Sequence, residues 1–143
     1  MVVPDTLAGP LRQAQRNMGL RVNIHAQAAY ADLIETGALV THLKRIARLY
    51  EDRGRLLVET LRARLGGAIA IGMPMGGLQT VMGFADHIDD TGVAALLADQ
   101  GFETPALSSY CAGQKRKGLV VGFADATDKR VARFAGLLEG LLN

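Results

Sequence analysis

The longest hydrophobic pattern in the chain runs from Ala38 to Leu65, where apolar residues recur at every third or fourth position. The positions in this stripe are Leu39, Leu43, Ile46, Tyr50, Gly54, Leu57, Leu61 and Leu65. That spacing places them on one face of a helix, with most charged residues on the other faces. We therefore predict a helix about 40 Å long over residues 38–65, ended by the glycine pair Gly66-Gly67. Shorter helices are predicted before it, over residues 5–18 and 25–36.

The second half of the chain alternates between strand and helix patterns. Strands are predicted over residues 68–71, 78–84, 102–107 and 118–124, and a polar loop over 108–117. In the second strand, Gln79 and Val81 face away from Leu78, Thr80, Met82 and Phe84. A helix capped by Asp89 or Asp90, with an apolar stripe of Val93, Leu96 and Leu97, ends at Gly101, and Thr127 caps a last helix.

This order of elements predicts an α+β fold with a small antiparallel or mixed sheet of about four strands, on which the long helix and further helices pack. The core is expected to bring one face of the long helix onto the sheet and the last helix. Its predicted members are Leu43, Ile46, Leu57, Leu61, Val81, Val121, Phe134 and Leu138. A length of 143 residues fits one domain, so we treat residues 1–143 as a single domain in which residues 1–36 form linking helices.

Composition excludes several classes of protein. With 49% hydrophobic residues and a net charge of +2, the chain is neither disordered nor basic enough to indicate nucleic-acid binding by itself. No stretch approaches the ~18 consecutive apolar residues of a membrane span, and no secretory signal is visible at the N-terminus. Cys111, the single cysteine, cannot form an internal disulfide, which fits the reducing cytoplasm.

Motifs that would indicate chemistry are missing from the sequence. His25, His42 and His87 lie far apart and lack partners at metal-ligand spacing, so no metal site is predicted. The basic residues of the long helix alternate with Glu51, Asp52 and Glu59, as on a solvated face. Cys111 precedes a basic tip at residues 114–117 and has no orienting histidine beside it, so we assign it no nucleophilic role. No catalytic residue is predicted from these patterns.

Five segments nevertheless carry a family resemblance. Residues 36–61 match the helix pattern G-x-x-x-x-H-[LIV]-R-R-[MIL]-R-x-x-Y-x-x-R-R-x-x-L through Gly37, His42, Lys44, Arg45, Arg48, Tyr50, Arg53 and Leu57. The later segments 76–81 (GGLQTV), 107–110 (LSSY) and 118–124 (GLVVGFA), and the opening residues 1–4, agree in order. This sequence resembles the C-terminal small domain of fold-type I pyridoxal-phosphate aminotransferases, and more narrowly the aminotransferase-like half of MocR/GabR-type regulators of the GntR family.

The resemblance implies that residues 37–143 correspond to the aminotransferase small domain and residues 1–36 to the helices that link it to the large domain. It also implies pyridoxal phosphate as the cofactor of the full-length family. The family's Schiff-base lysine, its phosphate-binding arginine and its DNA-binding domain correspond to positions upstream of Met1. For this chain in isolation we therefore expect no bound cofactor.

The resemblance also identifies three residues on the substrate side, namely Tyr110, Gln79 and Val120. Two of them depart from the family pattern. Gln79 stands where the family has histidine, and Val120 stands where ordinary aminotransferases have the arginine that binds the substrate carboxylate. A valine cannot bind a carboxylate, so ordinary amino-acid recognition is not expected here.

Two functions follow as hypotheses. In the first, the chain is a stand-alone or truncated small domain of an aminotransferase-like transcriptional regulator, not catalytic by itself, which acts by protein interaction or by binding a small ligand. In the second, it completes an aminotransferase whose large domain is separately encoded. The expected partner is a second copy of the chain or that large domain, with no membrane and no nucleic acid bound by this chain alone.

Overall fold

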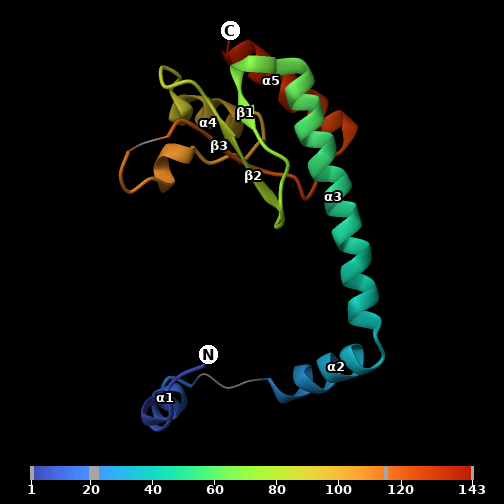
Figure 1. The fold of residues 1–143 in the computed structure, drawn as a ribbon, viewed down its shortest axis with the longest axis vertical. Coiled ribbons are helices and arrows are strands. Elements are labelled where there is room, and N and C mark those ends of the chain that lie inside the picture. Colours follow the sequence, from blue (N-terminus) through green and yellow to red (C-terminus); the bar gives the residue numbers. More distant parts are fainter. Residues whose placement is uncertain (1, 20–22, 115, 143) are drawn as a thin grey trace. The chain divides into compact units, whose positions relative to one another are not determined.

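The computed structural model describes residues 2–19, 23–114 and 116–142, and for residues 24 and 25 it describes only the backbone. The elements are α1 (Asp5–Asn17), α2 (Ile24–Glu35), α3 (Ala38–Leu65), the 3-10 turn η1 (Gly66–Ala68), β1 (Ala70–Ile71), β2 (Gln79–Gly83), α4 (Asp90–Asp99), the 3-10 turn η2 (Leu107–Tyr110), β3 (Gly118–Gly122) and α5 (Asp128–Leu142) (Figure 1). They form two compact units, residues 1–44 and residues 45–143. No helix in the described part is long and apolar enough to cross a membrane.

The N-terminal unit holds α1, α2 and the first turns of α3. None of its residues with a described side chain is buried. Nine of its large apolar side chains are instead exposed by 40% or more of their surface: Val2, Leu7, Leu11, Met18, Tyr30, Leu33, Ile34, Val40 and Leu43. These helices therefore form without an apolar core of their own.

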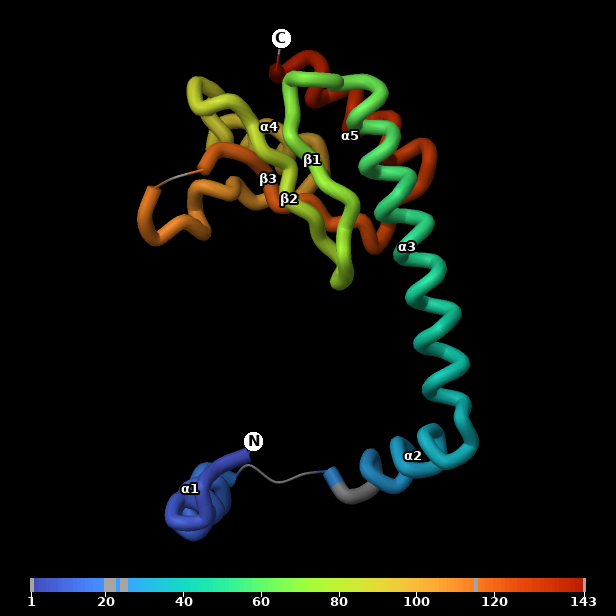
Figure 2. The backbone as a smooth tube through the Cα atoms, in the orientation of Figure 1, coloured from blue at the N-terminus to red at the C-terminus, as the bar shows by residue number. Residues whose placement is uncertain are grey.

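The C-terminal unit is built on an antiparallel sheet in the order β1-β2-β3 (Figure 2). In the register of the sheet, Ile71 pairs with Met82, and Met82 pairs with Leu119. These three residues and Val121 are buried, so they define the inner face of the sheet. Both edges of the sheet are covered. Arg62 of α3 donates two hydrogen bonds to the carbonyl of Ile71 on β1, and the carbonyl of Pro105 accepts from the amide of Val120 on β3.

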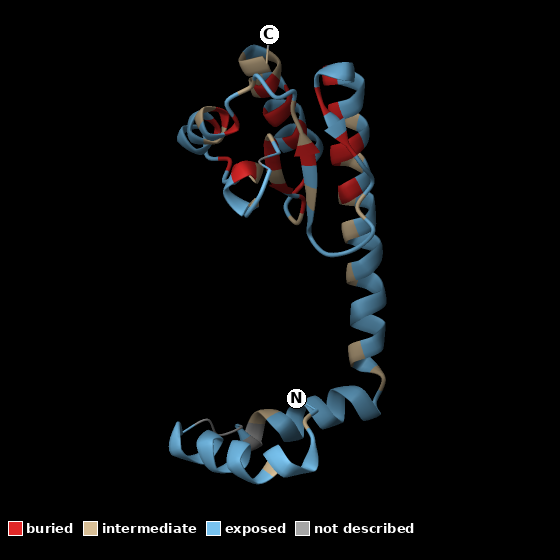
Figure 3. Ribbon diagram, turned by 60° about the vertical axis from the view of Figure 1, so that its left-hand side comes forward, coloured by how far each residue is buried: buried red, intermediate tan, exposed pale blue. Residues whose placement is uncertain are grey.

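The core of this unit joins the inner face of the sheet to three helices. α3 contributes Leu57, Val58, Leu61 and Leu65, and α5 contributes Val131, Phe134, Ala135 and Leu138. These buried residues lie on the sides of α3 and α5 that face each other (Figure 3). Phe102 follows α4 in the chain, and the centroid of its ring lies 5.1 Å from the centroid of the Phe134 ring. At the surface, Arg64 of α3 pairs with Glu139 of α5 at 2.6 Å.

Gly54 shows why α3 can pack closely at this point. A Cβ atom built on it would lie 2.9 Å from Cγ of Pro74 and 3.5 Å from the Phe123 ring. Only glycine leaves room for the β1–β2 connection and for Phe123 to lie against the helix. The amino-terminal part of the hydrophobic stripe of α3 is not buried, because all buried residues of this helix lie from Gly54 onward.

The predicted α+β fold and the bounds of α3 are confirmed, and three expectations need correction. Residues 102–107 are not a strand, and the sheet has three strands among the described residues. Phe102, Thr104 and Ala106 are buried in alternation with exposed residues, but only Ala106 bridges to Leu119. Pro105 lacks the N–H that a paired strand would use, which limits this segment to a single bridge.

The other corrections concern burial. Leu43 and Val81 were expected in the core and are 54% and 43% exposed. Leu43 lies on the part of α3 that belongs to the N-terminal unit, whereas Val81 lies on the outer face of the sheet. Leu96, expected on the apolar stripe of α4, is 52% exposed. The remaining predicted core residues are buried, except Ile46, which is half-buried.

Candidate functional site

Two of the three predicted site residues meet on the outer face of the sheet. Gln79 begins β2, and Val120 lies in the middle of β3 opposite Val81. Gln79 and Val81 are two residues apart on one strand, so Gln79 and Val120 are diagonal neighbours on the same face. Tyr110 ends η2 and is 66% exposed. The structure thus places Gln79 and Val120 on one face of the sheet and Tyr110 on a separate element, η2.

This outer face is unusually apolar for a surface. An antiparallel sheet with one solvated face normally carries polar residues there. Here the three cross-strand rows are Ala70, Gly83 and Gly118; Val81 and Val120; and Gln79 and Gly122. Gln79 is the only polar side chain among them. The face therefore has the composition of a contact surface rather than of a solvated one.

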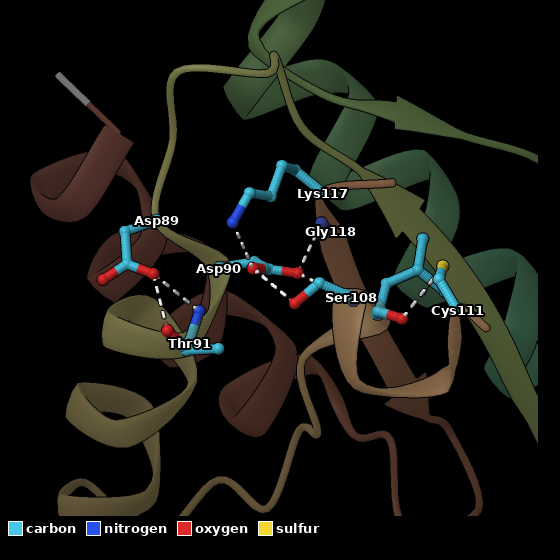
Figure 4. A network of polar contacts seen from close by, with 8 residues as sticks. Asp89, Asp90, Thr91, Ser108, Cys111, Lys117 and Gly118 are labelled. Atoms are coloured by element: carbon cyan, nitrogen blue, oxygen red, sulfur yellow. Dashed lines mark hydrogen bonds and ion pairs between the residues drawn. The ribbon is translucent and has the colours of Figure 1, made fainter. Parts of the chain in front are cut away.

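Behind this face, a buried carboxylate organises the segment that leads into β3 (Figure 4). Asp90, the first residue of α4, has no exposed surface. Its Oδ1 accepts from Ser108 Oγ at 2.9 Å and from Lys117 Nζ at 3.2 Å. Its Oδ2 accepts from the amides of Ser108 at 2.9 Å and Gly118 at 3.3 Å. One carboxylate thereby joins α4, η2 and the start of β3.

The electrostatics of Asp90 follow from these contacts. Burial by itself would raise the pKa of Asp90, since it disfavours the charged form. The hydrogen bonds from Ser108, Lys117 and Gly118 outweigh burial, and the pKa of Asp90 is lowered. Neighbouring Asp89 caps α4, and its pKa is also lowered, chiefly by the hydrogen bond from the Thr91 hydroxyl. Both carboxylates are therefore ionised at neutral pH.

Gly118 is required where this network meets the sheet. A Cβ atom built there would lie only 2.2 Å from the carbonyl oxygen of Met82. With glycine, the backbone of β3 can approach β2 while the Gly118 amide donates to Asp90.

Sequence reasoning missed two of the residues that shape this region. It treated Asp90 only as a possible helix cap, because its partners lie 18 and 28 residues further along the chain. It placed Arg62 on a solvated face, whereas the guanidinium binds the sheet edge. The solvated-face interpretation does describe Arg55, which pairs with Glu51 at 3.3 Å. It fails for Arg64, which binds Glu139 of α5.

A hollow of about 460 Å³ lies between α3 and the β1–β2 connection and is lined by Tyr50, Arg55, Met73, Met75 and Phe123, among others. Met75 is fully exposed. Its side chain therefore lies in solvent and does not pack into the core.

The remaining candidates whose side chains are described do not form a catalytic cluster. Among the described residues, no group of three or more His, Cys, Asp or Glu side chains could hold a metal. His42 and His87 are exposed, and the side chain of His25 lies outside the described residues. Cys111 is half-buried, with its sulfur 3.5 Å from the Leu107 carbonyl.

The described lysines do not suit pyridoxal phosphate. A Schiff-base lysine must be desolvated or lie beside another cation. Lys44 on α3 and Lys129 on α5 are exposed, and Lys117 is bound to the Asp90 carboxylate. Lys115 lies outside the described residues. The lysines whose placement is described therefore do not fit a cofactor-anchoring role, and we derive no reaction step through this cofactor.

Comparison with known proteins identifies the relatives of the chain. No family model matches it. It is 30% identical over 130 residues to a Rhizobium meliloti protein named "Probable rhizopine catabolism regulatory protein MocR", which covers 90% of this chain and 26% of that protein. It is 26% identical over 132 residues to the HTH-type transcriptional regulator YhdI of Bacillus subtilis, covering 92% of this chain and 28% of YhdI. The chain thus spans about a quarter of the length of these curated relatives.

Solved structures identify the fold. The multiple substrate aminotransferase of Thermococcus profundus superposes with a TM-score of 0.82 at 17% identity, over 96% of this chain and 34% of that chain. The α-aminoadipate aminotransferase LysN of Thermus thermophilus gives 0.80 at 18% identity, over 99% of this chain and 37% of LysN. The inferred resemblance is confirmed, because the curated relatives are MocR-type regulators and the fold is that of an aminotransferase small domain.

Proposed function

We propose that this chain, an aminotransferase-like domain of the MocR regulator type, is not catalytic by itself and acts in the cytoplasm by protein interaction or by binding a small ligand. The observation that carries the proposal is the setting of its lysines. Lys44 and Lys129 are solvated, and the ammonium of Lys117 is held by Asp90 at 3.2 Å. The valine at position 120 adds support, since it offers no cation to a substrate carboxylate.

Reductive trapping tests this proposal. The chain is mixed with pyridoxal phosphate and borohydride, and the adducts are located by peptide mass spectrometry. We expect only scattered, low-occupancy labelling of the exposed lysines. A stoichiometric adduct on one lysine would overturn the proposal.

The interaction part of the proposal rests on the N-terminal unit. Its helices expose a row of large apolar side chains, which a monomer in water does not normally leave uncovered over a large area. A symmetric homodimer covers such a patch with its own copy. On α1, Leu7 and Leu11 are four residues apart on one face and are 51% and 40% exposed.

Light scattering across micromolar concentrations tests the homodimer. We expect a mass of about 30 kDa, twice the 15.2 kDa of one chain. Leu11→Arg should shift the equilibrium toward monomer, while Gln13→Arg on the same helix adds the same charge and should not. A monomer at all concentrations, or equal effects of the two substitutions, would refute self-association through α1.

An aminotransferase completed by a separately encoded large domain is the second candidate. The observation that favours it is the same exposed apolar surface, together with the apolar outer face of the sheet. Only this candidate requires a lysine-bearing partner, so co-purification of such a partner, with cofactor bound to its lysine, would favour it over the first.

A further inference from the structure

We infer that the outer face of the sheet holds a binding site for a small anion with an apolar body, located between Arg62 and Arg116. A hollow of about 610 Å³ lies there, lined by Arg62, Arg116 and parts of η1, β1 and β2. Its volume falls within the range of about 300–1,000 Å³ that is typical of small-molecule sites. None of the described residues that line it is acidic. The inference deepens the ligand-binding part of the proposed function and rests on it.

Arg62 provides a fixed cation on one side of the hollow. Its Nε and Nη2 atoms donate to the Ile71 carbonyl at 3.1 and 2.7 Å. A guanidinium has five N–H groups, and these two bonds use two of them. The edge formed by Nη1 and Nη2 still has N–H groups to donate, which is the arrangement that binds a carboxylate or phosphate in a bidentate manner. The carbonyl contact therefore orients the group without saturating it.

Arg116 provides the second cation, and the two residues that follow it are fixed by the buried Asp90 carboxylate. The next residue, Lys117, is tied to Asp90 through its ammonium, and Gly118 is tied to the same carboxylate through its amide. The Asp90 charge is thus balanced by the Lys117 ammonium. Arg116 lines the hollow, and no acidic side chain is among the described lining residues.

The floor of the hollow is apolar and flat. Ala70 and Gly83 are cross-strand partners, so almost no side chain rises above the sheet there. Beside them, Val81 is 43% exposed and contributes apolar surface. A ligand with an anionic end and a compact apolar body would place its charge between the two guanidinium groups and bury its body on this floor. Carboxylates and phosphate monoesters share this chemistry.

Isothermal titration of the full chain with phenyl phosphate, benzoate and inorganic phosphate tests the inference. We expect at least one of the two aromatic anions to bind, and to bind more tightly than inorganic phosphate, with an affinity that falls as salt rises. The order of phenyl phosphate and benzoate tells whether the site prefers phosphate or carboxylate. Absence of binding by both aromatic anions at millimolar concentration, or equal affinity for inorganic phosphate, would overturn the inference.

Two substitutions locate the site. Arg116→Gln should weaken binding about tenfold or more, as expected for the loss of a charge-assisted hydrogen bond. Arg48→Gln, which removes the same charge from an exposed position on α3 outside the hollow, should leave affinity unchanged. Arg62→Gln should also weaken binding, and its melting temperature reports whether the sheet edge is intact. Equal affinity of Arg116→Gln and Arg48→Gln would refute the site. These measurements are independent of lysine trapping, so the two proposals can fail separately.

Discussion

Replacing Asp90 with asparagine tests the role assigned to the buried carboxylate. The two oxygens of Asp90 accept four hydrogen bonds, two from Ser108 and one each from Lys117 and Gly118. Asparagine keeps one oxygen and turns an NH₂ group toward donors on the other side. The substitution therefore leaves at least one amide or hydroxyl unsatisfied and removes the counter-charge of Lys117.

The expected cost can be set from these contacts. Breaking a fully buried ion pair costs about 3–5 kcal/mol. The side chain of Lys117 is 28% exposed and can regain some hydration, so we expect about 2–4 kcal/mol for Asp90→Asn. That is a large part of the total stability of a small domain, about 5–15 kcal/mol.

Urea unfolding followed by circular dichroism measures this cost at neutral pH and in acid. The pKa of Asp90 is lowered in the folded state, so its contribution to stability is complete above the unfolded value of about 3.9 and is lost as pH falls through the lower folded value. The difference between wild type and Asp90→Asn should therefore shrink at and below about pH 4. Asp86→Asn, at an exposed position, should match wild type. A neutral-pH effect below about 0.5 kcal/mol, or a difference that does not change with pH, would refute the reasoning.

Two further predictions concern the core and the sheet. Phe134→Ala should destabilise the C-terminal unit by about 3–5 kcal/mol, because the ring is 3% exposed and packs on Phe102; a midpoint in urea equal to that of wild type would contradict this. Gly118→Ala should unfold the chain or strongly lower its melting temperature, since the added Cβ meets the Met82 carbonyl. Gly140→Ala on α5, where there is open space, should not have this effect. Equal melting temperatures of the two variants would contradict the close approach of β2 and β3.

The elements that the sequence predicts well are those whose pattern is local. α3 was predicted with its observed bounds, because eight apolar positions over seven turns and a terminal Gly66 leave little ambiguity. The predicted strand over residues 78–84 exceeds β2 by one residue at each end. The predicted strand over residues 118–124 begins where β3 begins and exceeds it by two residues at its carboxyl end. The failure at residues 102–107 is also local in origin: the alternation is present, but Pro105 prevents a ladder.

What could not be predicted depends on residues that are distant in sequence. No pattern marks Asp90 as buried, since Ser108 and Lys117 come together only when β3 pairs with β2. Gln79 and Val120 lie on one face because of the register between β2 and β3. The sequence indicated which way Gln79 faces within its own strand, but it did not indicate how the two strands pair. The hollow beside Arg62 arises because α3 passes along the edge of β1. The charge pattern of α3 by itself resembles that of a solvated face, so it did not indicate this contact.

Lysine trapping tests the proposed non-catalytic role most directly. The full chain is incubated with excess pyridoxal phosphate, reduced with borohydride and digested, and occupancy is measured separately at Lys44, Lys115, Lys117 and Lys129. We predict partial labelling without a dominant site, lowest at Lys117 because its ammonium is held by Asp90. Near-complete labelling of a single lysine at one cofactor per chain would contradict the proposal that this domain is not catalytic by itself.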